Sequence, residues 1–490
     1  MSEEHRPEEH RPGGHRPGHP TRTAVVVGAG LAGLTAATGL AARGIEVTVL
    51  EARERVGGRT HGIEAAPGAW VDAGAAYLGD RHTELLSTAA ELGLKTTPTT
   101  MLGASRFALD GETGADPETE SPGTGTDPGP GPDPSTGPGA ADGEAATRDG
   151  RFPPLNAVAL GDLFDRLAEL TAGVRPEAPW LTPDAERLDT TTAAEWAERH
   201  LTHPDARRFF PLFLGEMCAA DPADVSVLHL AFYLRSGGGL RYLNAFAGGA
   251  QQDRIDGGAH QVCERLAERL GGRVRLGEPV RAVHQDDRGV TVHTDRGSHR
   301  ADVAVLALPP LLADAIEHRP ALPAPRAGER TARGCAVKVH LVYPAPLWRE
   351  HGLSGWSVNA RGPLLSTVDD SPEGGIGVLT GFVTGAEAHR FAALTPRRQR
   401  AEAFAQAARL FPMLPEPTGF HVTDWLNDPF SRGCYAALLG PGDWLRLGPT
   451  LTTPHRRVHW AGTETSTAFF GLMEGAIRSG HRVVAEVLDR

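Results

Sequence analysis

A glycine-rich turn between two short apolar runs constrains the fold of this chain more than any other feature. Residues 23–27 (TAVVV) are typical of a buried parallel strand. The pattern Gly28-x-Gly30-x-x-Gly33 follows and opens a helical stretch rich in Ala and Leu, after which a second apolar run ends at Glu51. This order predicts a Rossmann-like β-α-β unit that binds a dinucleotide, with the pyrophosphate against the glycine backbone at the helix start.

The residues at the end of the second run favour FAD among the dinucleotides. Glu51 is placed to accept hydrogen bonds from ribose hydroxyls, which disfavours the 2′-phosphate of NADP. The segment EARERVGGRT then supplies arginines that can neutralise phosphate and glycines that allow close backbone approach: Arg53, Arg59, Gly57 and Gly58. We therefore expect FAD as the cofactor.

Charge and composition locate two segments outside the folded body. The formal net charge is −12, and residues 110–149 hold ten acids against one arginine in a Pro/Gly-rich stretch with almost no large apolar side chains. Such a stretch cannot bury enough surface to offset its ordering entropy, so a disordered insertion is predicted there. The first 22 residues contain imperfect His-Arg-Pro repeats and are predicted to be a disordered tail.

Other composition features exclude several classes of protein. The four cysteines are far apart in the sequence, so neither a disulfide framework nor a metal cluster is expected, and the cytoplasm is the simplest compartment. The chain has no apolar run long enough to span a membrane and no secretory signal. It also lacks a basic stripe for nucleic acid outside the short tail.

Several later segments carry further patterns. They are WVDAGAAYLG (70–79), FYLRSGGG (232–239), GGAQQDRIDGG (248–258), AVKVHLVYPAPLWRE (336–350), VDDSPEG (368–374), RGCY (432–435) and WAGTETSTAFFGLMEGA (460–476). Together with LEARERVGGRT they resemble, in sequence and in order, the motifs of the flavin-dependent monoamine oxidase family. The resemblance extends over nearly all of residues 23–490 except the acidic insertion.

The resemblance implies an α/β fold with two domains. A Rossmann-like FAD-binding domain would be assembled from separated segments and joined to a substrate domain of mixed sheet and helices. The expected FAD-binding segments are 23–100, 248–320 and 421–490, and the expected substrate-domain segments are 101–247 and 321–420.

The resemblance also implies an activity. Members of the family oxidise a C–N bond of a small-molecule amine to an imine by hydride transfer to flavin N5, and O₂ is reduced to hydrogen peroxide. Two alternatives stay open: an FAD-dependent dehydrogenase or desaturase of a specialised metabolite, and a flavoprotein without amine turnover. A homodimer is also left open.

Residues that match the family motifs take their expected roles from it. Lys338 would hold a water against flavin N5, Trp425 would pack against the flavin, and Tyr435 would form one wall of an aromatic pair around the amine. Three further positions are expected to contact FAD, at the adenine, the ribityl or pyrophosphate region, and the ring: Val280, Glu464 and Met473, respectively.

Departures from the family pattern concern Cys434 and the substrate pocket. Cys434 either bonds through sulfur to the flavin 8α-carbon, as in covalent members, or is a structural thiol, and the sequence leaves both open. Leu472 stands where the family usually has the second aromatic wall. The other residues expected in the pocket are Phe469, Glu216 and Ser236, and Glu216 is a candidate anchor for a second ammonium group or a bulky polar substrate.

Overall fold

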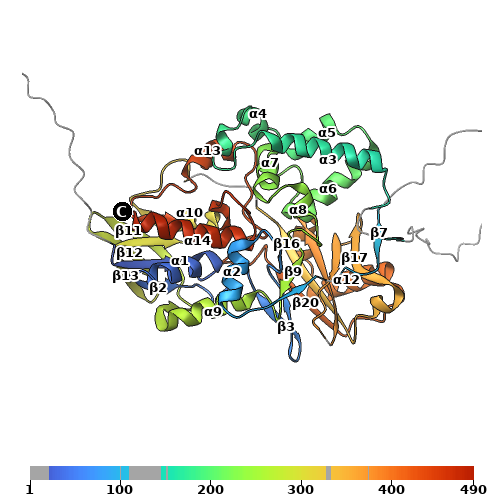
Figure 1. Cartoon of the computed structure of the whole chain (residues 1–490), viewed down its shortest axis with the longest axis horizontal. Coiled ribbons are helices and arrows are strands. Elements are labelled where there is room, and N and C mark those ends of the chain that lie inside the picture. Colours follow the sequence, from blue (N-terminus) through green and yellow to red (C-terminus); the bar gives the residue numbers. More distant parts are fainter. Residues whose placement is uncertain are drawn as a thin grey trace, which may run out of the picture.

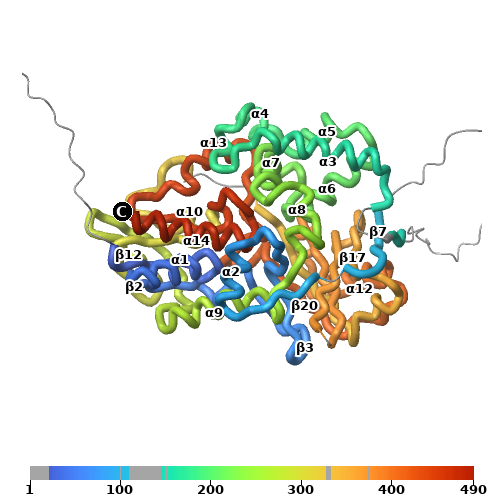
Figure 2. The backbone as a smooth tube through the Cα atoms, in the orientation of Figure 1, coloured from blue at the N-terminus to red at the C-terminus, as the bar shows by residue number. Residues whose placement is uncertain are grey.

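The computed structural model describes residues 21–99, 101–109, 145–149, 153–326, 333–373 and 375–489. Figure 1 shows a unit built around a parallel sheet at the left and a second unit, with helices above a mixed sheet, at the right. The chain passes between them several times, so the blue N-terminal and red C-terminal segments lie next to one another in the first unit (Figure 2).

The first unit is built on a parallel sheet with five strands. Their order is β10 (Val274–Arg275), β2 (Glu46–Leu50), β1 (Thr23–Val27), β14 (Val303–Leu306) and β21 (Val458–Trp460). Side chains alternate along a strand, so Ala24 and Val26 pack against helices while Val25 and Val27 pack against a second sheet. Burial on both faces explains why this run is apolar throughout.

Three helices cover one face of the parallel sheet, and an antiparallel layer covers the other. The helices are α1 (Leu31–Ala41), α9 (His260–Leu270) and α14 (Met473–Leu488). The layer has the order β13 (Gly297–Ala301), β12 (Gly289–Thr294), β11 (Val280–Asp286) and β15 (Glu317–Arg319), the last two being parallel.

The second unit combines a mixed sheet with a helical layer. The sheet has the order β20 (Gly419–Asp424), β16 (Ala336–Tyr343), β19 (Gly377–Thr384), β18 (Ser366–Asp369), β17 (Leu353–Asn359), β7 (Ala104–Ala108) and β8 (Ala146–Asp149). Its longer helices are α3 (Ala157–Ala172), α5 (Ala193–His200), α6 (Pro204–Cys218), α7 (Val227–Ser236), α11 (Gly385–Ala392) and α12 (Pro396–Leu410).

The remaining elements are mostly short. The strands are β3 (Gly62–Ala66), β4 (Ala69–Asp72), β5 (Tyr77–Leu78), β6 (Thr96–Pro98) and β9 (Asp253–Ile255). The helices are α2 (Thr83–Glu91), α4 (Ala185–Thr190), α8 (Leu240–Leu243), α10 (Pro310–Ala315) and α13 (Asp443–Leu447). Single 3₁₀ turns span Pro179–Leu181, Gly271–Arg273, Leu347–His351, Gly448–Thr450 and Thr463–Thr465.

The α/β fold class is confirmed, and two sequence boundaries differ. Residues 110–144 of the predicted insertion, and residues 1–20 of the predicted tail, lie outside the described residues. Ala146–Asp149 is β8 rather than part of an insertion, because it pairs with β7 at the sheet edge. β20 crosses the boundary expected at residue 420, since it pairs with β16. No helix in the described ranges is long and apolar enough to cross a membrane.

Candidate active site

One cavity of about 900 Å³ extends through both units. At one end it is lined by the glycine turn of the first unit, at the other by the mixed sheet and helices of the second. Most of the expected site residues lie on its wall: Gly28, Gly30, Glu51, Arg53, Gly58, Arg59, Glu216, Val280, Lys338, Trp425, Cys434, Tyr435, Leu472 and Met473. The cavity therefore brings together side chains that are up to several hundred residues apart in the sequence.

At the first end, close backbone packing explains the glycine pattern. Gly28 has a φ of +100°, and a Cβ there would lie 2.7 Å from the Ala307 carbonyl oxygen. Gly33 lies inside α1 and does not line the cavity; a Cβ on it would lie 1.9 Å from the Gly28 oxygen. The missing side chains let α1 start directly against the end of β1, which leaves its first turn open to the cavity.

Glu51 is fixed at the end of β2. Its side chain is 4% exposed. Its Oε2 accepts a hydrogen bond from the Ala29 amide at 2.8 Å, and its Oε1 accepts one from the Arg53 amide at 3.0 Å. Val280 lines the cavity at the start of β11, the strand that follows the short loop after β10. A carboxylate held in this way, on a wall without Cβ atoms at the turn, fits the ribose of a dinucleotide.

The two arginines expected at phosphate have protein partners instead. The Arg53 guanidinium forms an ion pair with Asp428 and donates to Ser431 Oγ at 2.8 Å. Arg59 donates to both carboxylate oxygens of Glu464, at 2.6 and 3.0 Å, and to the Tyr435 carbonyl oxygen at 2.9 Å. Both arginines line the cavity. Through these contacts each arginine also joins segments that are distant in the sequence.

Glu464 is placed behind the wall and not on it. Burial opposes its ionisation, but Arg59 outweighs burial and, with a hydrogen bond from the Ala437 amide, holds the pKa of the Glu464 carboxyl below its ordinary value. The expected direct contact of Glu464 with the cofactor is therefore not supported by its position. Its carboxylate instead fixes the segments that carry Arg59 and Tyr435.

At the second end, Lys338 and Trp425 hold the same stretch of backbone. Lys338 lies in β16, a strand whose residues are all buried, and its Nζ donates to the carbonyl oxygens of Asp72 at 2.5 Å and Gly74 at 3.1 Å. Trp425 Nε1 donates to the Ala73 oxygen at 2.9 Å. Burial lowers the pKa of the Lys338 ammonium group. Two side chains of the second unit thus anchor a cavity-lining segment of the first.

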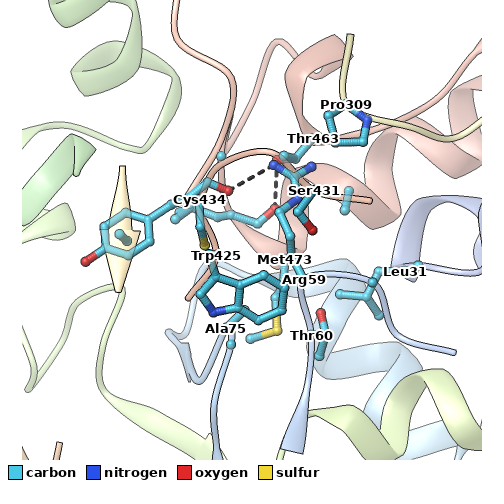
Figure 3. Close-up of a pocket in the computed structure, with 18 of the residues that line it drawn as sticks. Leu31, Arg59, Thr60, Ala75, Pro309, Trp425, Ser431, Cys434, Thr463 and Met473 are labelled. Carbon is cyan, nitrogen blue, oxygen red and sulfur yellow. Dashed lines mark hydrogen bonds between the residues drawn. The ribbon is translucent and has the colours of Figure 1, made fainter. Parts of the chain in front are cut away.

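Cys434 and Tyr435 lie beside these anchors. Figure 3 shows Trp425, Cys434, Arg59 and Met473 gathered around one part of the cavity. Cys434 is 7% exposed, and burial raises the pKa of its thiol to about 11. The peptide bond between Cys434 and Tyr435 is cis. Met473 is the first residue of α14, so the amino end of that helix faces the cavity.

Two residues expected in the substrate pocket lie elsewhere. Phe469 and Ser236 are not on the cavity wall. The Phe469 amide donates to the Ser236 carbonyl oxygen at 2.8 Å, and the Phe469 ring packs 4.9 Å from the His82 ring. The Ser236 hydroxyl donates to the Tyr233 oxygen at 3.2 Å. Both residues therefore brace the wall from behind, which corrects the expectation.

Other wall residues were not identified from the sequence. They include aromatic side chains and one amide: Tyr77, Phe246, Trp356, Phe382 and Gln251. Tyr77 and Gln251 fall within the segments 70–79 and 248–258, so the motifs pointed near them. The remaining three come from strands or loops whose sequence does not reveal which side faces the cavity.

Comparisons with known proteins agree with this geometry. The profile described as "Flavin containing amine oxidoreductase" matches residues 31–488. A Dictyostelium discoideum protein described as a probable flavin-containing monoamine oxidase A is 32% identical over 473 residues, which is 95% of this chain and 97% of that one. The flavin-containing amine oxidase A of Canis lupus familiaris is 30% identical over 478 residues, 95% of this chain and 84% of that one.

A solved structure gives the same result. A putrescine oxidase with putrescine bound has a TM-score of 0.84 and 30% identity, and covers 96% of this chain and 99% of that one. FAD is accordingly the cofactor, and amine oxidation is the activity. This chain belongs to the family of flavin-containing amine oxidoreductases.

Proposed function

We propose that this protein oxidises an amine to an imine at the Lys338 end of the cavity and uses O₂ as the electron acceptor. The amine loses two electrons and two protons, O₂ gains them to give hydrogen peroxide, and water hydrolyses the imine to a carbonyl compound and an amine. Bound FAD supplies the two-electron chemistry at its N5 position. The supporting observation is one cavity that joins Gly28 and Glu51 to Lys338 and Tyr435.

The first end of the cavity suits the nucleotide part of FAD. Glu51 would accept hydrogen bonds from the ribose hydroxyls, and the backbone between Gly28 and Gly30 would face the pyrophosphate. Val280 would contact the adenine. The amino end of α14, which starts at Met473, would favour negative charge on the flavin ring.

At the other end we assign Lys338 to holding a water next to the reacting atoms. Its Nζ already donates to two carbonyl oxygens, so an ammonium or amine nitrogen here is fixed in place. Burial lowers the pKa of Lys338, which brings proton exchange with a bound water closer to the working range. Tyr435 and Leu472 would lie on either side of the amine and exclude solvent from it.

Peroxide release and flavin colour distinguish the proposal from its alternatives. An oxidase loses its yellow colour when an amine is added without O₂, then regains it and releases peroxide when O₂ is admitted. A dehydrogenase or desaturase would lose its colour with its substrate and regain it with another acceptor, without matching peroxide. A flavoprotein without amine turnover would keep its colour with every amine tested.

The state of Cys434 has its own test. A thioether to FAD would leave the yellow colour with the protein after acid precipitation, and a Cys434→Ala variant would release it. Loss of the colour from the original protein would identify Cys434 as a structural thiol, in keeping with the raised pKa of about 11 of its buried sulfur.

The compartment and the assembly state are further parts of the proposal. All four cysteines, Cys218, Cys263, Cys335 and Cys434, are free and buried, as is usual for proteins of the reducing cytoplasm. We therefore propose a cytoplasmic location, which fractionation of the source cells tests. A homodimer stays a prediction, and light scattering of the purified protein would measure its mass.

A further inference from the structure

Glu216 is an acid in the cavity wall for which the described residues supply no cationic partner. It belongs to α6, and the part of its side chain that is exposed opens into the cavity. Its Oε2 accepts a hydrogen bond from Ser366 Oγ at 2.6 Å. Among the described residues, no Lys, Arg or His forms an ion pair with it.

In the described part of the chain, the surroundings of Glu216 are largely apolar and supply no ion-pair partner. Burial raises the pKa of its carboxyl to about 7, and the hydrogen bond from Ser366 opposes this shift. Four apolar side chains of the same helix, α6, also line the cavity: Phe209, Leu212, Phe213 and Met217. An isolated buried carboxylate is costly unless it is protonated or meets a cation, so a cationic ligand would be favoured at this position.

The strand register places Glu216 relative to Lys338. Lys338 of β16 is paired with Phe382 of β19, and Phe382 is paired with Ser366 of β18. Directly opposed residues of antiparallel strands face the same side of a sheet, and Lys338 Nζ does lie 5.4 Å from the Phe382 ring. Ser366 is therefore two strand spacings, about 10 Å, from Lys338 on the same face. The Ser366 hydroxyl donates a hydrogen bond to the Glu216 carboxylate. That carboxylate therefore lies near Ser366, at the far end of this row of three residues from Lys338.

We propose that Glu216 binds a second ammonium group of the substrate, so that the preferred substrates are aliphatic diamines or polyamines. The reacting amine would lie near Lys338, an aliphatic spacer would cross the Phe382 ring, and the distal ammonium would pair with Glu216 about 10 Å away. This inference rests on the proposed amine oxidation. The substrate class is defined by its two charges and the distance between them. Glu216 determines specificity and takes no part in the chemical step.

The test compares three substrates of one chain length: diaminooctane, octylamine and aminooctanol, which carry an ammonium, a methyl and a hydroxyl at the far end. Peroxide release gives kcat/KM for each with the unmodified protein. We expect diaminooctane to exceed the other two by on the order of a hundredfold, mainly through KM, since a buried ion pair is made only with it. Equal values for diaminooctane and aminooctanol would overturn the proposal, because a neutral hydrogen bond would then suffice.

Two variants test whether the diamine preference depends on Glu216. Glu216→Gln keeps the shape and the contact with Ser366, and we expect it to remove the diamine preference with a much smaller change for octylamine. Glu198→Gln, which changes an exposed acid of α5, is the control and should retain the preference. A Glu216→Gln variant that still prefers the diamine, or loses all three substrates equally, contradicts the inference.

The same experiment separates this inference from the proposed function. If octylamine or any other amine bleaches the flavin and releases peroxide while the diamine has no advantage, amine oxidation stands and the role of Glu216 fails. If no amine bleaches the flavin, the proposed function itself fails. The comparison of substrates with the unmodified protein gives a result even if Glu216→Gln does not fold.

Discussion

Lys338 is the residue on which the proposed chemistry depends most. The sequence contains only two lysines, and the other, Lys95, is exposed. We expect Lys338→Met to lower kcat by on the order of a hundredfold with little change in KM, because a group that positions a water for proton transfer acts mainly after the amine binds. Steady-state peroxide release measures both constants.

Two controls accompany the Lys338 variant. Lys95→Met should leave both constants unchanged. The Lys338→Met protein should still hold FAD, which its absorption spectrum reports. An unchanged kcat in a flavin-loaded Lys338→Met variant would remove this lysine from the mechanism.

The titration of Glu216 should make the preference for diamines depend on pH. The carboxyl has a pKa of about 7, so it loses its charge, and its attraction for a distal ammonium, as pH falls through that value. The groups around it stay neutral there: burial raises the pKa of Cys218 to about 12 and raises the pKa of Tyr233 and Tyr435 above their ordinary values. The ratio of kcat/KM for diaminooctane to that for octylamine should therefore fall below pH 7.

The ratio cancels the effect of pH on protonation of the reacting amine, because both substrates carry that amine. A ratio that is constant across neutral pH would contradict the charge assigned to Glu216. In the Glu216→Gln variant the ratio should be flat as well as low, because the amide does not titrate in this range.

Single residues were predictable from sequence where a backbone requirement or a motif fixed them. Glu51 and Lys338, which their patterns singled out, both line the cavity. Phe469, Ser236 and Glu464 do not line the cavity, because packing between distant segments decides which side chains reach it and a local motif does not report that packing. The Arg53 pair with Asp428 joins residues 375 positions apart, a separation that no local pattern reports.

At the scale of elements, the start of α1 depends on the absence of a side chain at Gly33. A Cβ there would lie 1.9 Å from the Gly28 oxygen, which is backbone and cannot rotate away. We expect Gly33→Ala to destabilise the protein by about 3 kcal/mol and to weaken FAD binding, since α1 must move away from β1. Denaturant unfolding and the flavin content after purification measure the two effects.

Gly161 provides the matched control, since it also lies inside a helix. A Cβ at Gly161 of α3 meets nothing within 4 Å. Gly161→Ala should stabilise the protein by about 0.5–1 kcal/mol through helix propensity. Equal effects of the two substitutions would show that close packing at Gly33 is not required.

Elements with a local signal were predicted well, and elements defined by pairing were not. The β1-α1-β2 unit follows from two apolar runs and the glycine turn between them. β8 was assigned to the acidic insertion because the stretch it ends has almost no large apolar side chains, and its pairing with β7 decides its structure. β20 likewise passes the expected boundary because β16 offers it a partner.

At the scale of the whole molecule, Arg59 and Glu464 join three segments around the cavity. Arg59 donates to Glu464 and to the Tyr435 carbonyl oxygen, and Glu464 accepts from the Ala437 amide. Arg59→Met would leave the buried carboxylate without its counter-charge, and we expect a loss of about 3–5 kcal/mol in unfolding free energy. Thermal and denaturant unfolding measure it.

A double variant checks the cause of that loss. Adding Glu464→Gln to Arg59→Met removes the unpaired charge and should restore part of the stability, because the amide costs less to bury. If the double variant is as unstable as the sum of the two single variants, the ion pair is not what joins these segments.

The two units matter together because the cavity belongs to both. The glycine turn and Glu51 come from the first unit, and Lys338, Trp425 and Glu216 come from the second. This shared cavity is the basis of the proposed oxidation. The visible absorption of the flavin reports whether an amine is oxidised there.

The most direct measurement is the visible spectrum of the purified protein, mixed with an amine in the absence of O₂ and then exposed to O₂. We predict a yellow protein that one equivalent of the amine bleaches, with colour returning as one peroxide appears per flavin. A colourless protein that takes up no FAD, or a yellow one that no amine bleaches, would contradict the account.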